Sequence, residues 1–355
     1  MRVFSVIIPN MNINAIKQEV NWSELLLGIL ALMPILIGYG LFHNALLLKV
    51  GLVTISLYIP IARTKSGLYL VVPHFLLIGL CFSLLYFSMD LPYLFVLFVA
   101  GLAFGSIYLT SFGANLRTLG NFIFIPAVYL ACELRENLQA DAVVPVYIKF
   151  ITLMPIALIS IIVLMLIVSL FTYYKKSKIL PSGSHAVSFM HHVFYRKNSG
   201  EVKLDWLKEA MAIFLGVAIA AFFVVFMHIT RGEWIIWSTA AVITLDITSA
   251  KKKMKDRLIG LSIGIPVGFF VAQFLPKTQL MYSVAVLGIM LTLIAFKNYR
   301  MAFGSRCFFI AMVSYLATAT PQIAVERLEN VVIGSIIGMA AVYICHRVLG
   351  NFGRR

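Results

Sequence analysis

The chain has 355 residues, of which 61% are hydrophobic and only 12% charged, and its formal net charge is +15. An average soluble domain has roughly 25% charged residues, so this composition excludes an ordinary soluble fold. The basic excess could suit nucleic acid, but the basic residues follow the pattern of membrane loops, and we predict no nucleic-acid partner.

Apolar segments recur along the whole chain. A helix needs about 20 residues to cross roughly 30 Å of hydrocarbon, and most of these segments approach that length. The fifth is the shortest and contains Pro126. The sequence predicts an all-α integral membrane protein with about twelve transmembrane helices, at residues 25–42, 45–62, 68–88, 91–110, 118–132, 143–173, 207–229, 234–250, 258–275, 279–296, 302–320 and 328–349.

The distribution of basic residues predicts the orientation of these helices. Short cytoplasmic loops retain Lys and Arg. If the N-terminus is cytoplasmic, 23 of the 29 basic residues but only seven of the 14 acidic residues fall on the cytoplasmic side. Both termini are therefore predicted to be cytoplasmic. The six basic residues left on the outer side are Lys49, Arg135, Lys149, Arg231, Lys277 and Arg327.

The two halves of the chain resemble each other at a near-constant offset. His43 matches His228 and Gly79 matches Gly264, both 185 residues apart. Each half holds six predicted spans, so the halves share one orientation. Residues 1–174 and 206–355 are therefore predicted to be parallel six-helix repeats, joined by a basic cytoplasmic linker at 175–205, with a path or pocket between them. Further matches pair Trp22 with Trp206, Thr54 with Thr239, and residues 129–131 with 315–317.

The second half also carries a recognisable signature. Residues 233–268 read EWIIWSTAAVITLDITSAKKKMKDRLIGLSIGIPVG, and residues 326–338 read ERLENVVIGSIIG. This pattern resembles the fusaric acid resistance protein-like or aromatic acid exporter family. In the first half the repeat places Leu52 opposite Trp237 and Ile61 opposite Asp246, so the second half is expected to supply the chemistry. The matched positions are Trp234 or Trp237, Arg257 with Gly260 and Gly264, and Arg327 with Gly334 and Gly338.

The resemblance implies a multi-pass protein of the bacterial inner membrane that exports small aromatic carboxylates, driven by the membrane potential or by proton antiport. It implies a small organic anion and the lipid bilayer as partners, with a periplasmic adaptor by analogy. Two alternatives stay open: a passive organic-anion channel, and a non-transporting scaffold subunit of an envelope assembly. Because no phosphate-binding loop, hydrolase motif or metal-ligand spacing occurs, we predict no enzyme activity, no cofactor and no metal.

Three charged residues are candidates for the anion path. Asp246 lies in a predicted apolar helix, where a carboxylate is costly and often functional; alternatively it pairs with nearby lysines at the interface. Arg257 and Arg327 open predicted helices, where a guanidinium can hold a carboxylate at a positive helix end. Cytoplasmic retention explains Arg257 equally well, and a surface pair with a neighbouring glutamate explains Arg327.

Aromatic and small residues complete the candidate site. Trp234 and Trp237 could stack on an aromatic substrate, although tryptophan also gathers at membrane interfaces. The glycines Gly260, Gly264, Gly334 and Gly338 recur four residues apart in pairs, and this spacing predicts close helix packing.

Overall fold

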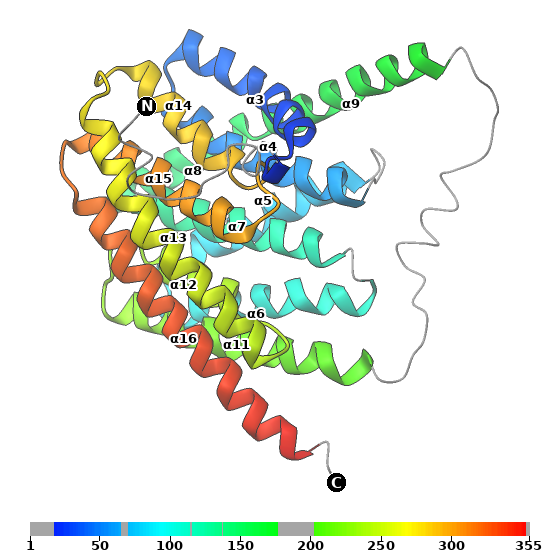
Figure 1. Cartoon of the computed structure of the whole chain (residues 1–355), viewed down its shortest axis with the longest axis vertical. Helices are drawn as coiled ribbons and strands as arrows, with labels where there is room; N and C mark the ends of the chain where they lie inside the picture. Colours follow the sequence, from blue (N-terminus) through cyan, green and yellow to red (C-terminus); the bar gives the residue numbers. More distant parts are fainter. Residues whose placement is uncertain (1–17, 65–69, 114–115, 137, 177–201, 353–355) are drawn as a thin grey trace.

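The computed structural model describes residues 18–64, 70–113, 116–136, 138–176 and 202–352 (Figure 1). This part of the chain is helical throughout, apart from turns and one isolated bridge between Val20 and Phe296. The predicted linker at 175–205 falls mostly outside it.

The helices follow the predicted segments in order. In the first half they are α3 (Trp22–Phe42), α4 (Ala45–Thr64), α5 (Val71–Ser88), α6 (Pro92–Tyr108), η2 (Leu109–Ser111), α7 (Leu116–Arg135), η3 (Ala140–Ala142), α8 (Val143–Leu153) and α9 (Pro155–Lys176). In the second half they are α11 (Val202–Phe226), α12 (Glu233–Val242), α13 (Ile247–Gln273), α14 (Gln279–Leu291), α15 (Tyr299–Thr318) and α16 (Gln322–Phe352).

The structure confirms an α-helical membrane protein with many spans. Within the described ranges, 9 helical segments are long and apolar enough to cross a bilayer, and each corresponds to one of the predicted spans. The other predicted spans, 118–132, 234–250 and 279–296, correspond to α7, α12 and α14, which do not meet that standard. At 1.5 Å per residue, α12 is only about 15 Å long.

The predicted helix at 234–250 is corrected in its second half. Helix α12 ends at Val242, residue Ile243 is extended, and α13 begins at Ile247, well before the predicted start at 258. Asp246 accepts a hydrogen bond from the backbone N–H of Ser249 at 2.7 Å, so its carboxylate caps α13. The predicted span at 143–173 is confirmed as one apolar segment, Val143–Leu170, although it consists of two helices, α8 and α9.

The outer surface of the helices is apolar. Large aliphatic and aromatic side chains are exposed on helices of both halves, a surface that lipid tails would cover without cost. Examples are Leu26, Leu80, Leu97, Leu170, Phe274 and Ile336.

The two halves are interleaved. Helix α6 of the first half packs more extensively against α11 of the second half than against any described helix of its own half. On the opposite side, α14 packs against α4 and α3, and α12 contacts α7. Figure 1 shows α6 beside α11 and α14 near α3 and α4. Residues from both halves therefore face one another near the centre.

Backbone geometry follows the predicted offset at the end of the first helix in each half. His43 follows α3 and His228 follows α11, and both adopt left-handed conformations, with φ of 48° and 49°. Such values are uncommon outside glycine. The two histidines are 185 residues apart, which is the offset found in the sequence.

The signature glycines lie where helices approach closely. A Cβ atom at Gly264 would collide with the backbone oxygen of Gly304, and one at Gly260 would lie 3.0 Å from the Gly304 nitrogen, so α13 and α15 meet backbone to backbone. On the other side of the second half, α16 approaches α12. A Cβ at Gly334 would collide with the oxygen of Ile235, and one at Gly338 would lie 2.7 Å from the oxygen of Thr239.

Candidate anion-binding pocket

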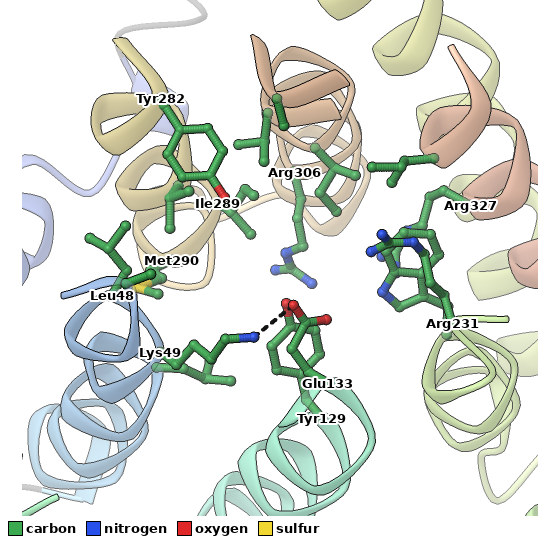
Figure 2. Close-up of a pocket in the computed structure, with 18 of the residues that line it drawn as sticks. Leu48, Lys49, Tyr129, Glu133, Arg231, Tyr282, Ile289, Met290, Arg306 and Arg327 are labelled. Carbon is green, nitrogen blue, oxygen red and sulfur yellow. Dashed lines mark hydrogen bonds and ion pairs between the residues drawn. The ribbon is translucent and has the colours of Figure 1, made fainter. Parts of the chain in front are cut away.

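A cavity of about 370 Å³ lies between the two halves (Figure 2). The first half contributes α4 and α7, and the second half contributes the region around α12 together with α14, α15 and α16. Two of these, α12 and α14, are the short helices. Because α12 and α16 both begin near the cavity, their positive helix ends favour a negative ligand there.

Two pairs of positions that the predicted repeat matches line the cavity together. Lys49 on α4 corresponds to Trp234, and Leu52 corresponds to Trp237. Positions that the predicted repeat pairs therefore both line the cavity, but they carry different side chains in the two halves.

The cavity contains more positive than negative charge. Its charged lining residues are Lys49, Glu133, Arg231, Arg306 and Arg327. Two of the cations have acidic partners: Lys49 Nζ lies 2.8 Å from Glu133 Oε1, and Arg231 Nε lies 3.2 Å from Oε2 of Glu326 on α16.

Arg306 and Arg327 have no acidic partner among the described residues. The Arg327 side chain is 3% exposed, and its Nε has no hydrogen-bond partner. Arg306 donates from Nε to Thr292 Oγ1 at 3.2 Å. Figure 2 shows Arg306 pointing from α15 into the cavity toward Glu133. Buried cations without counter-ions are costly, and these two are available to a bound anion.

Arg257 lies outside the cavity lining but close to this pair. It donates to Tyr299 Oη at 2.8 Å and to Ser238 Oγ at 2.7 Å, and its guanidinium lies 4.2 Å from the centre of the Phe303 ring. It is 4% exposed, and its Nε has no partner. It too has no acidic partner in the described chain. Arg257, Arg306 and Arg327 interact electrostatically with one another, and this interaction is repulsive.

The two tryptophans have different surroundings. Two guanidinium groups lie over the ring of Trp234: that of Arg327 at 4.8 Å and that of Arg231 at 5.5 Å. Trp234 is thus already in cation–π contact and orients these cations. Trp237 has no cation over its ring among the described contacts, and it lies 6.0 Å from the Tyr129 ring. Trp237 is therefore the better platform for an aromatic ligand.

The structure does not bring Asp246 to the cavity. It lies in the exposed turn between α12 and α13. The hydrogen bond with Ser249 lowers the pKa of its carboxyl below the ordinary value, as expected for a capping carboxylate. Its predicted position inside an apolar helix was wrong because α12 ends four residues earlier.

Sequence reasoning missed Lys49, Glu133, Arg231 and Arg306 as lining residues. A signal existed for Lys49 and Arg231, because both break the charge asymmetry of the loops, as does Arg327. Arg306 is one of the 23 basic residues predicted to be cytoplasmic, but α15 begins at Tyr299, so Arg306 lies about two turns inside the helix.

Comparison with known families supports the resemblance found in the sequence. Residues 217–341 match the sequence model of a family described as fusaric acid resistance protein-like. The match covers about a third of the chain and includes all three unpaired arginines. Comparison with curated proteins and with solved structures gives no match. In this membrane protein the segment 217–341 of the second half is therefore similar to the fusaric acid resistance protein-like family, as the sequence signature indicates.

Proposed function

We propose that this protein exports small aromatic carboxylates across the bacterial inner membrane through the pocket between its halves. The observation that carries the proposal is the group of three arginines, Arg257, Arg306 and Arg327, which lack acidic partners in the described structure and lie at or beside the cavity. Ionisable residues inside a membrane protein commonly mark a substrate path.

Electrostatics favours an anion in this pocket over water alone. Like charges repel more strongly in a low dielectric than in water, and the three guanidinium groups repel one another. A carboxylate between them would neutralise part of this charge and could accept paired hydrogen bonds from a guanidinium. The attraction between the bound carboxylate and the arginines would then offset part of the free-energy cost of burying these cations without counter-ions.

The proposed route runs from the cytoplasmic side to the outer side of the membrane along the second half of the chain. Arg257 lies near the basic start of α13, and Arg327 lies in the second turn of α16. In the proposed topology of twelve spans with both termini cytoplasmic, Arg257 receives the anion from the cytoplasm and Arg327 presents it to the outer side. Trp237 and Tyr129 would hold an aromatic ring. Asp246 is left outside this route because it caps an exposed helix end.

The driving force need not come from ATP. With the cell interior negative, one exported monoanion gains about 2.3 kcal/mol per 100 mV of membrane potential. Proton antiport is the second driving force to be tested. A periplasmic adaptor is proposed only from the family resemblance.

The direct test is uptake of labelled benzoate into inverted proteoliposomes with an imposed membrane potential or pH gradient. We expect uptake that depends on a gradient, saturates and is lost in Arg327→Met. Arg347→Met is the matched control, since Arg347 is exposed on the same helix.

Two other outcomes of the uptake experiment would point to the alternative functions. Movement that does not saturate and cannot be driven uphill would favour the channel. If no aromatic carboxylate is transported or bound, the proposal is contradicted, and a non-transporting scaffold subunit becomes the better explanation.

A further inference from the structure

Glu233 is a buried carboxyl that the proposed route does not use. It is the first residue of α12, its side chain is 2% exposed, and Oε1 has no hydrogen-bond partner. No ion pair involving Glu233 is present in the described structure. Its sequence neighbours Arg231 and Trp234 both line the cavity.

The charged surroundings of Glu233 come from three parts of the chain. Glu133 and Glu136, at the end of α7, oppose its negative charge. Arg231, in the turn before α12, favours that charge but is already paired with Glu326. The remaining titratable neighbours are Tyr129 and Cys132 on α7 and Arg327 on α16.

Glu233 and a bound anion would compete for the same cation. Arg327 interacts electrostatically with Glu233 and is also the most buried cation of the cavity lining without an acidic partner. When Glu233 is ionised, Arg327 is partly neutralised and the pocket attracts an anion less strongly. When Glu233 holds a proton, the full charge of Arg327 is available to the ligand. Binding of either ligand therefore favours binding of the other.

We propose that Glu233 takes up a proton when an anion fills the pocket, so that protons and substrate bind cooperatively. This inference rests on the proposed function and adds a regulatory group to the same site. Because proton and anion bind together rather than in exchange, Glu233 sets the pH at which the pocket fills and is not an antiport group.

The test is isothermal titration of benzoate into the full-length protein in lipid nanodiscs, in two buffers of different ionisation enthalpy. The difference between buffers gives the number of protons taken up per anion. We expect close to one proton at a pH where Glu233 is mostly ionised in the empty protein, and benzoate affinity that falls by up to about tenfold per pH unit as pH rises.

Two carboxyl-to-amide variants separate this role from a structural one. Glu233→Gln should bind benzoate without proton uptake and with an affinity that hardly changes with pH. Asp246→Asn removes an exposed carboxylate that caps a helix and should behave like the wild type. Thermal unfolding of each variant checks that the fold is retained.

The outcomes distinguish this inference from the proposed function. Benzoate binding with unchanged proton uptake in Glu233→Gln, or with no uptake in the wild type, would overturn the role of Glu233 and leave the transport proposal standing. If Glu233→Gln is only less stable, with the same pH dependence of binding, Glu233 merely stabilises the start of α12. Failure of the wild type to bind benzoate would contradict both.

Discussion

The two halves of the molecule contribute differently to the walls of one pocket. The first half supplies Lys49 together with its counter-ion Glu133, so its charges are balanced. The second half supplies Arg306 and Arg327, which have no acidic partner in the described chain, beside the equally unpaired Arg257. The ion pair in the first half stabilises the fold, whereas the arginines of the second half, which lack acidic partners, are available to a ligand.

One backbone feature recurs at the predicted repeat offset, while the side chains at paired positions differ. His43 and His228 keep the same unusual conformation 185 residues apart, while the equivalent positions 49 and 234 hold a lysine and a tryptophan. The helices differ too: α4 is continuous from Ala45 to Thr64, whereas the stretch that the predicted repeat pairs with it is divided between α12 and α13.

The largest effect is expected from Gly264→Ala. Its new methyl group would collide with the backbone of Gly304 and force α13 away from α15, and overpacking of this kind costs about 3 kcal/mol. Thermal unfolding in detergent should show a clearly lowered midpoint. The repeat-equivalent control is Gly79→Ala, where the nearest atom to the new methyl would be Met154 Cε at 3.7 Å, an ordinary contact. Equal destabilisation of both variants would contradict the difference in helix packing.

Arg327→Met should weaken benzoate binding by about 30-fold or more, equivalent to about 2 kcal/mol, and yet raise thermal stability. Removing a buried charge without a counter-ion removes its desolvation penalty. Calorimetric titration and thermal unfolding measure the two effects on the same sample. A variant that loses stability together with binding would show that the contacts of Arg327 with Trp234 and Glu233 outweigh its desolvation penalty.

Lys49→Met should lower stability by about 1–2 kcal/mol, because it leaves Glu133 half-buried without its cation. The double variant Lys49→Met/Glu133→Gln should recover most of that loss, and Glu133→Gln alone should tighten anion binding by making the pocket more positive. A double-mutant cycle of unfolding free energies gives the coupling. Additive losses would mean that the ion pair contributes nothing.

Trp237→Leu replaces the tryptophan by leucine, the residue type at position 52, which the predicted repeat pairs with position 237. Loss of an aromatic contact costs about 1 kcal/mol, so benzoate affinity should fall about fivefold while acetate affinity stays the same. Competition binding with both acids measures this selectivity. Equal losses for the two acids would remove Trp237 as an aromatic platform.

Asp246→Asn should have the smallest effect, with transport unchanged. Asparagine caps a helix as well as aspartate does. Because its hydrogen bond lowers the pKa of Asp246, the ionised cap adds stability above the ordinary carboxyl pKa and loses it as pH falls through the lowered value. Transport at neutral pH and unfolding at acidic pH check the two statements. Loss of transport in this variant would return Asp246 to the anion path.

Much of the fold follows from composition and periodicity, because long apolar runs in lipid have few alternatives to helices. The break between α12 and α13 does not follow: residues 243–246 read ITLD, with neither glycine nor proline to mark the end of the helix. Only Asp246, with Ser249 three residues later, hints at a new helix start. Tertiary packing of the short α12 against α16 decides the rest.

The site was predictable in part. Trp234, Trp237 and Arg327 line the pocket, and Lys49 and Arg231 stood out as basic residues on the outer side. Pairing of these cations could not be read from the chain, because Lys49 and Glu133 are 84 residues apart. Whether a membrane arginine is free or balanced depends on such long-range neighbours, and only the structure supplies them.

The contact between α6 and α11 has a consequence for biosynthesis. Helix α6 leaves the ribosome long before α11, yet α11 is its main packing partner. Until α11 has been synthesised, the face of α6 that will contact it is covered by lipid or by an insertion factor. Assembly of the first half is then completed only after translation has passed α11. If the two halves were expressed as separate polypeptides, both would have to be present in the same membrane for the structure to assemble.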